Sequence, residues 1–166
     1  KFHIQIIDNM SKNTKVNAAI LIIGNEILSG RTQDTNTSTL AVWLNSLGVL
    51  VNEVRVIPDI KKIIIDNLNV LRKNNDYVFT TGGIGPTHDD ITAESVSEAF
   101  GLKYEIHPDA FKILESYYKQ GEFNEGRQKM AWMPHNAKLI LNPTSGAPGF
   151  SIENVFCLPG VPSILK

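Results

Sequence analysis

A cluster of glycines and two adjacent carboxylates follow a short apolar run in the middle of the chain. Three glycines lie within residues 82–85, and Asp89 and Asp90 come soon after them. Glycines let the backbone approach a ligand closely, and the amides at the start of a following helix can meet an anion. Two carboxylates would repel a bare phosphate, so they indicate a metal ion or a proton-transfer step beside the phosphate. The alternative is an ordinary strand-to-helix turn, capped by one of the acids or by Thr92.

Strand-like and helix-like segments alternate before this turn. Residues 18–23 form a continuous apolar run, as expected of a strand buried on both faces. Apolar residues at helical spacing follow over 40–47 and end at a glycine, and 49–57 is the next strand-like segment. An amphipathic helix over 60–71 and a strand over 77–80 then lead to the turn.

The order of these segments is β-α-β-α-β-α. It predicts an α/β fold, a three-layer sandwich in which a mostly parallel sheet has helices on both faces. After the turn, we predict helices over 92–100 and from about 107 onward, and short strands over 138–141 and 155–158. The polar, glycine-containing stretch 120–127 is predicted to be a mobile excursion.

Length, charge and cysteine content narrow the class of protein. The 166 residues suit one domain, which we predict to cover 18–166 after an amino-terminal extension of residues 1–17. The 16 basic and 17 acidic residues form no basic stripe, which argues against nucleic-acid binding. No apolar run approaches the roughly 20 residues of a membrane helix, and residues 1–17 lack the pattern of a signal peptide. The single cysteine, Cys157, excludes a disulfide framework, and we expect a cytoplasmic protein.

Polar and glycine-rich loops follow the predicted strands. In open sheets of this kind, ligands bind outside the carboxyl ends of the strands. The loops expected there are 24–30, 34–37, 58–59, 82–92, 142–149 and 159–162. Their convergence predicts a pocket large enough for a nucleotide.

The motifs in these loops resemble those of the molybdopterin-binding-like domain of the MoaB/MogA superfamily, most closely its CinA branch. In family order, they are Gly24-Asn25-Glu26-Ile27-Leu28, Asp34-Thr35-Asn36, Gly82-Gly83-Ile84-Gly85-Pro86-Thr87-His88-Asp89-Asp90-Ile91-Thr92, Gly146-Ala147-Pro148-Gly149 and Pro159-Gly160-Val161-Pro162. The resemblance implies a MoaB/MogA-like fold, a nucleotide or pterin phosphate ligand, and a homo-oligomer, either dimer or trimer. The substrate-binding residues it implies are Gly24, Asn25, Glu26, Asn36, Thr81, Gly82, Gly83, Gly85, Thr92, Gly146, Pro159 and Gly160.

The resemblance also implies a catalytic pair. In molybdopterin adenylyltransferases of this superfamily, an Asp after the second strand and an Asp in the glycine loop are important for activity, and they match Asp59 and Asp90. The position before the latter is often Arg in those enzymes but is Asp89 here, which favours the CinA pattern. CinA-like domains are associated with divalent-metal-dependent hydrolysis of ADP-ribose-type pyrophosphates. We therefore expect Mg²⁺, Mn²⁺ or Co²⁺ at Asp89 and Asp90.

Several candidate residues have a structural alternative. Asp59 follows a proline and precedes an apolar helical run, so it could serve as a helix N-cap, with or without a catalytic role. Glu26 either orients a ribose hydroxyl or metal-bound water or faces solvent, and Asn36 either binds ligand or forms an Asx turn. Asp89 could be a solvated neighbour of Asp90, and His88 could be an acid or base but is more typical of a surface residue.

Aromatic and basic residues elsewhere are open to similar alternatives. Trp43 and Trp132 are more typical of packing residues than of stacking platforms. By analogy with CinA-like domains, Arg127 could contact phosphate, and the alternative is a solvated loop charge.

The chain also departs from the CinA pattern near its end. The CinA pattern places an acid shortly after the last motif, where Ser163 and Ile164 stand here. The separate deamidase domain of full-length CinA proteins is absent from the sequence, which begins without Met and suggests a fragment.

Three functions remain open at this stage. The first is a nucleotide pyrophosphatase acting on ADP-ribose or FAD through Asp59, Asp90 and a divalent metal. The second is a protein that binds or adenylylates a pterin phosphate in molybdenum cofactor biosynthesis. The third is a noncatalytic module that binds a nucleotide or oligomerises, because fold alone does not fix function.

Overall fold

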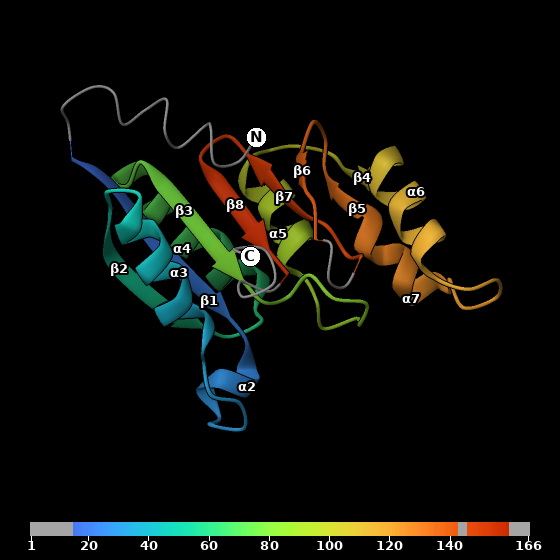
Figure 1. The fold of residues 1–166 in the computed structure, drawn as a ribbon, viewed down its shortest axis with the longest axis horizontal. Helices are drawn as coiled ribbons and strands as arrows, with labels where there is room; N and C mark the ends of the chain where they lie inside the picture. The colour runs from blue at the N-terminus through green and yellow to red at the C-terminus, as the bar shows by residue number, and fades with distance from the viewer. Residues whose placement is uncertain (1–14, 143–145, 160–166) are drawn as a thin grey trace.

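A six-stranded sheet forms the centre of the molecule, as a computed structural model shows (Figure 1). The structure describes residues 15–142 and 146–159. The strand order is β2-β1-β3-β8-β7-β6, and β4 and β5 pair in a small separate sheet. Within the described ranges, no helix has the length and apolar character needed to cross a membrane. Gly160 and most of the predicted 1–17 extension lie outside these ranges.

Four neighbouring strands of the sheet are parallel: β2 (Val49–Ile57), β1 (Val16–Ile23), β3 (Tyr77–Thr81) and β8 (Val155–Leu158). Nearly every residue of β1, β3 and β8 is buried, which is why the sequence shows them as continuous apolar runs. The prediction of a mostly parallel sheet is therefore confirmed. β1 begins two residues earlier than the predicted strand.

The remaining strands are short. β7 (Gly149–Ile152) and β6 (Lys138–Ile140) extend the sheet in the antiparallel direction, and β4 (Tyr104–Ile106) pairs antiparallel with β5 (Trp132–Pro134). Strands β4, β5 and β7 were not predicted from the sequence. Segments of three or four residues are too short to show a period, and here they are fixed by pairing with distant strands.

Helices cover both faces of the sheet, as predicted. α3 (Asn36–Ser46) places Leu40 and Leu44 on one face. α4 (Lys61–Asn74) and α5 (Thr92–Ala99) pack on the other face. Leu40, Leu44 and the inward residues of α4 are completely buried, so both apolar helix stripes inferred from spacing are real.

A smaller lobe beside the sheet contains α6 (Pro108–Tyr117), α7 (Glu125–Gln128) and the short 3₁₀ helix η1 (Lys129–Ala131) (Figure 1). Part of this lobe is the stretch predicted to be a mobile excursion. That prediction missed α7, which is capped by the side chain of Asn124. Aromatic stacking between Tyr118 and Phe123 also ties the segment together.

A reciprocal pair of hydrogen bonds links β1 to the start of β3. At the amino end of β1, the backbone N–H of Asn17 donates to Asp76 Oδ2 and the backbone N–H of Asp76 donates to Asn17 Oδ1, each at 2.9 Å. In the middle of the sheet, Cys157 of β8 lies between Thr80 of β3 and Phe150 of β7. Burial raises the pKa of the Cys157 thiol to about 12, so it is an inert core side chain.

Candidate functional site

The loops after β1 and β2 are joined by a pair of hydrogen bonds. The backbone N–H of Asn25, the first residue of α2 (Asn25–Leu28), donates to Asp59 Oδ2 at 3.0 Å. In return, the backbone N–H of Asp59 donates to Asn25 Oδ1 at 3.3 Å. One oxygen of Asp59 is therefore held in place, while Oδ1 lies on the side of the glycine loop, 3.6 Å from where a Cβ on Gly83 would stand.

The glycine loop turns sharply against its neighbours. Gly82 and Gly83 have φ values of 90° and 70°, a backbone conformation that residues with a side chain rarely adopt. A Cβ on Gly82 would lie 2.1 Å from Ile23 O, and one on Gly83 would lie 2.1 Å from Thr92 Oγ1. Within the described residues, the N–H groups of Gly83, Ile84 and Gly85 donate to no protein acceptor. They are therefore free to donate to an anion.

Thr92 anchors this loop to the start of α5. Its hydroxyl donates to Gly82 O at 3.0 Å and its backbone N–H donates to Gly83 O at 2.9 Å. The side chain is completely buried. These bonds give Thr92 a positioning role, and the helix N-cap is Ile91 rather than Thr92 or an acid.

Asp90 is oriented by a neighbour within the loop. Its Oδ2 accepts hydrogen bonds from the Thr87 backbone N–H at 2.9 Å and from Thr87 Oγ1 at 2.8 Å. A Cβ on Gly85 would lie 2.8 Å from the same oxygen, so the turn closes tightly around the carboxylate. From the other side, Lys129 Nζ donates to Thr87 O and, at 2.6 Å, to Asp90 O.

These loops form one polar cleft at the carboxyl end of the parallel strands, with a volume of about 320 Å³. The cleft is lined by Ile23, Asn25, Glu26, Arg31, Asp59, Gly83, Thr87, Asp89 and Asp90. Asp59 and Asp90, predicted from separate motifs, therefore lie at the same site. Four carboxylates face a single guanidinium there, so a phosphate ligand would need further positive charge or donated hydrogen bonds.

The electrostatics of the cleft act most clearly on Asp59. Burial raises the pKa of its carboxyl above the ordinary 3.8, and the negative charges of Glu26, Asp90 and Asp89 raise it further. The hydrogen bond from the Asn25 backbone opposes this rise. A carboxylate with a raised pKa and one free oxygen is suited to accepting a proton.

The donor set fits a divalent cation only in part. In the part of the chain that the structure describes, no group of three or more Asp, Glu, His or Cys side chains is placed to hold a metal ion. Mg²⁺, however, is usually bound by one or two carboxylates together with substrate phosphates and water. Asp89 and Asp90 therefore fit a cation that arrives with a phosphate ligand better than one that is permanently bound.

Other sequence-predicted residues have different positions. Asp59 does not cap its helix, whose N-cap is Ile60, because its carboxylate is bound to Asn25. The Asx turn before α3 is made by Asp34, whose Oδ1 accepts from the backbone N–H of Asn36 at 2.9 Å, so the Asx-turn alternative for Asn36 is wrong. Asn36 also does not line the cleft.

Several further predicted residues lie outside the cleft. Thr81 is buried at the end of β3, and Gly146 faces the Tyr117 ring, which a Cβ would approach to 2.5 Å. His88 is almost fully exposed and lies 3.2 Å from Asp89, as expected of a surface residue. The ligand contacts predicted for Gly24, Gly82 and Pro159 remain predictions.

Arg127 contacts residues of its own lobe. Its guanidinium lies 4.5 Å from the centre of the Tyr118 ring and donates to Glu122 O. It is not among the residues that line the cleft. The cation-π contact stabilises the lobe, so Arg127 is neither a solvated loop charge nor positioned here as a phosphate ligand.

Arg31, Thr87 and Lys129 were not predicted as site residues from the sequence. Arg31 follows Gly30, which has a φ of 73°, and its Nε donates to Ser29 Oγ at 3.0 Å while the terminal nitrogens remain available. Lys129 is 39 residues from Asp90 in sequence, and no local pattern connects them. Only Thr87 had a local signal in the sequence. It lies three residues before Asp90, a spacing at which an Asp side chain can hydrogen-bond across a turn.

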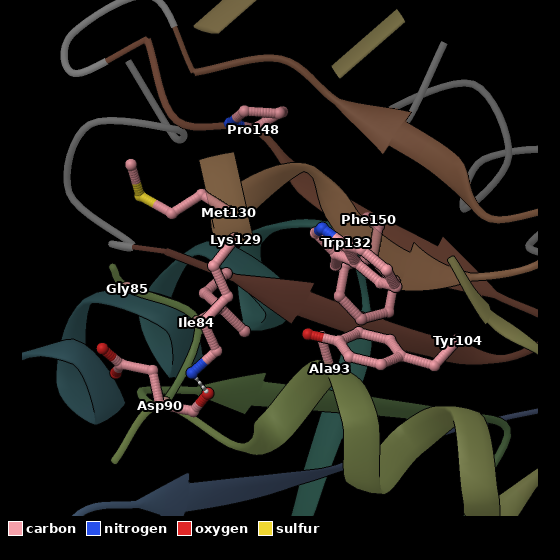
Figure 2. Close-up of a pocket in the computed structure, with 11 residues that line it drawn as sticks. Ile84, Gly85, Asp90, Ala93, Tyr104, Lys129, Met130, Trp132, Pro148 and Phe150 are labelled. Atoms are coloured by element: carbon pink, nitrogen blue, oxygen red, sulfur yellow. Dashed lines mark hydrogen bonds between the residues drawn. The ribbon is translucent and has the colours of Figure 1, made fainter. Parts of the chain in front are cut away.

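A second recess lies on the far side of the glycine loop (Figure 2). Trp132 and Tyr104 line it with ring centres 5.4 Å apart, and burial raises the pKa of Tyr104 to about 12. Its free volume is only about 10 Å³, room for about one water molecule. The recess therefore has little room for a ligand, and Trp132, although exposed, contacts the Tyr104 ring there. Trp43 packs against the core on α3.

Comparison with known proteins agrees with this architecture. Residues 19–166 match the family described as "Probable molybdopterin binding domain". The crystal structure of the protein CinA with unknown function from Thermoplasma acidophilum is 34% identical, covers 92% of this chain and 93% of its own, and has a TM-score of 0.83. The molybdopterin biosynthesis enzyme MoaB of Thermus thermophilus shares the fold with a TM-score of 0.59, at 19% identity over 90% of this chain and 84% of its own.

Longer relatives are also similar in sequence. A protein of Archaeoglobus fulgidus is 37% identical over 147 residues, covering 89% of this chain and 63% of that protein. A protein of Aeropyrum pernix is 40% identical over 155 residues, covering 90% of this chain and 58% of that protein. The chain therefore spans about three fifths of the length of these relatives.

Proposed function

The chain belongs to the molybdopterin-binding domain family and to its CinA branch, and from this membership and the acidic cleft we propose that it hydrolyses a nucleotide pyrophosphate of the ADP-ribose or FAD type. The observation that carries the proposal is the position of Asp59. Its carboxyl has a raised pKa, one oxygen fixed by Asn25 and the other beside the glycine loop. This arrangement suits a general base next to a phosphate site.

The glycine loop would bind the pyrophosphate. The free N–H groups of Gly83, Ile84 and Gly85 would donate to phosphate oxygens and stabilise the negative charge that develops as the bond breaks. Arg31 would pair with a second phosphate oxygen through its terminal nitrogens. The positive φ of Gly83 is what allows the backbone to present these groups while Thr92 holds it from below.

Asp59 would act on the attacking water. Oδ1 of Asp59 would accept a proton from the water while the water oxygen bonds to phosphorus. The bond between that phosphorus and the bridging oxygen would break, giving two phosphate monoesters. A divalent cation at Asp89 and Asp90 would supply charge neutralisation and polarise the phosphate oxygens. Thr87 would hold Oδ2 of Asp90, so that the other carboxylate oxygen faces the ligand.

A second candidate function follows from the family itself. Its description supports binding of a molybdopterin, and adenylylation of a pterin phosphate would use the same glycine loop and acids. Asp89 argues for the pyrophosphatase, because an extra carboxylate suits a cation and disfavours a ligand that arrives as a bare phosphate.

The test is hydrolysis of ADP-ribose and FAD with Mg²⁺, Mn²⁺ or Co²⁺, measured as AMP release. We expect release in the wild type, loss in D90N, and wild-type rates in D66N, which removes an exposed carboxylate on α4. A folded wild type that binds nucleotide without releasing AMP would contradict the proposal. Tighter binding of a pterin phosphate than of ADP-ribose would favour the second candidate.

A further inference from the structure

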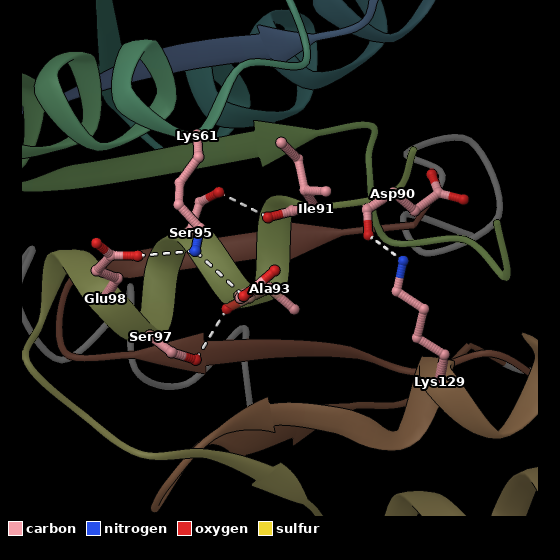
Figure 3. Close-up of polar contacts among 9 residues, drawn as sticks. Lys61, Asp90, Ile91, Ala93, Ser95, Ser97, Glu98 and Lys129 are labelled. Carbon is pink, nitrogen blue, oxygen red and sulfur yellow. Dashed lines mark hydrogen bonds and ion pairs between the residues drawn. The ribbon is translucent and has the colours of Figure 1, made fainter. Parts of the chain in front are cut away.

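Lys129 connects the lobe to the acidic loop. Its ammonium group donates to the carbonyl oxygens of Thr87 and Asp90, the two residues whose side chains are hydrogen-bonded to each other. Figure 3 shows Lys129 reaching this loop from one side while Lys61 reaches α5 from the other. We propose that Lys129 is a positioning residue that fixes the 87–90 turn and so aims the Asp90 carboxylate into the cleft.

The turn needs such an external hold. Thr87 and Asp90 are joined by the backbone bond from Asp90 N–H to Thr87 O at 3.2 Å, and by the bonds to Asp90 Oδ2. Thr87 is exposed and Asp90 is half-buried, so water competes for all these bonds. A single ammonium that bonds both carbonyls restrains both ends of the turn at once.

The backbone that carries Lys129 is itself held in place by neighbouring contacts. It begins η1, directly after α7, where Asn124 Oδ1 accepts the Arg127 N–H at 3.0 Å. The following Ala131 is completely buried, and its carbonyl accepts the His107 N–H at 2.8 Å. The ammonium is therefore held by a fixed element rather than by a loop.

A second contact between α7 and the acidic loop supports the same reading. A Cβ built on Gly126 would lie 2.9 Å from Pro86 O, so this part of α7 packs directly on the loop backbone. Glycine is unfavourable inside a helix, and its presence here allows the close approach. Lys129 and Gly126 thus brace the segment 86–90 from the same side.

The inference rests on the proposed function for its consequence in catalysis, but the restraint itself can be measured without activity. In K129M, which keeps the apolar stem, we expect amide exchange at Thr87 and Asp90, followed by NMR, to be about tenfold faster than in the wild type. K61M removes the salt bridges to Glu94 and Glu98 and should leave both amides unchanged. Unchanged exchange in K129M would overturn the proposal.

The kinetic arm uses the same variants. We expect K129M to lower kcat for ADP-ribose hydrolysis by about tenfold to a hundredfold with little change in KM, because a misplaced group costs rate rather than binding. K129R, which keeps the donors, should recover part of the loss, and K61M should match the wild type. A change in KM or in Tm alone would contradict a positioning role.

Gly126→Ala provides an independent variant in case K129M does not fold. Alanine is a better helix former than glycine, so a purely structural role predicts equal or higher stability. The proposal predicts lower kcat and faster exchange at Thr87 and Asp90, because the new Cβ would push α7 away from the loop. If the wild type hydrolyses no pyrophosphate, the proposed function fails, while the exchange measurements still decide the role of Lys129.

Discussion

Asn25 and Asp59 hold each other through two hydrogen bonds, from Asn25 N–H to Asp59 Oδ2 and from Asp59 N–H to Asn25 Oδ1. The same reciprocal pair occurs between Asn17 and Asp76 at the opposite end of β1. Only the first pair lies in the acidic cleft. The molecule therefore contains a structural twin of its candidate catalytic connection, which can serve as a control.

The first prediction concerns Asp59→Asn. An asparagine oxygen can still accept the Asn25 N–H, but the side chain cannot take a proton, so we expect kcat to fall by about 10²–10⁴-fold with the fold intact. Steady-state AMP release and circular dichroism measure the two effects. D76N alters the twin connection and should keep wild-type kcat. A D59N protein with wild-type kcat would rule out the general-base role.

The second prediction concerns stability and pH. Because the pKa of Asp59 is raised, the folded state binds its proton more tightly than the unfolded chain does. Stability contributed by this group therefore falls as pH rises from the ordinary pKa of 3.8 through the raised value, and stays low above it. We expect D59N to have a higher Tm than the wild type at pH 7.5, with a smaller difference near pH 4. A lower Tm for D59N at pH 7.5 would contradict the stated electrostatics.

The third prediction concerns the divalent cation. Since the described residues offer no cluster of three metal-binding side chains, Mg²⁺ alone should leave the Tm nearly unchanged. Mg²⁺ with ADP-ribose should raise it more than ADP-ribose alone, because phosphates complete the coordination. Thermal scans of wild type and D90N measure this coupling. Equal Tm gains with and without Mg²⁺ would exclude a shared cation.

The fourth prediction separates backbone strain from crowding at glycine. Gly83 and Gly101 have similar φ values of 70° and 64°, but a Cβ would meet Thr92 Oγ1 at Gly83 and nothing within 4 Å at Gly101. We expect G101A to cost about 1–2 kcal/mol with normal activity. G83A should cost more and abolish turnover. Urea unfolding and AMP release provide the comparison, and equal costs would show that crowding at Gly83 is unimportant.

The fifth prediction concerns Arg31. Loss of a charge-assisted hydrogen bond of about 1.5–3 kcal/mol should raise the KM for ADP-ribose by at least about tenfold in R31M. The effect should shrink at high salt, because the guanidinium is exposed. R55M, which alters a guanidinium paired with Glu53 on β2, is the matched control. A KM equal to that of R55M would remove Arg31 from the phosphate site.

The sequence was a good guide where an element shows an unbroken apolar run or a clear helical period. The buried strands β1, β3 and β8 follow from their apolar runs, and the apolar stripes of α3 and α4 follow from residue spacing. Chains of this order form parallel sheets, so the convergence of the loops that carry Asp59 and Asp90 at one edge also followed. That the two carboxylates line the same cleft is known only from the structure.

The remaining features depend on contacts that no local pattern encodes. β4 and β5 form because Tyr104 and Pro134 pair across 30 residues. Asp59 does not cap α4, and its carboxylate accepts a hydrogen bond from Asn25 instead. Arg31 and Lys129 are single basic residues without a motif, so only the folded arrangement shows what they contact.

Cys157 can serve as a native probe of how often the core opens. It is the single cysteine of the sequence, it is completely buried, and it sits between β3 and β7. Its thiol packs in the core between the sheet and helices α4 and α5, so a thiol reagent can react only when that core opens. Val78 of β3, the strand that leads into the glycine loop, belongs to the same core, so the rate of labelling would report how often the support beneath the loop opens, without any change to the residues that line the cleft.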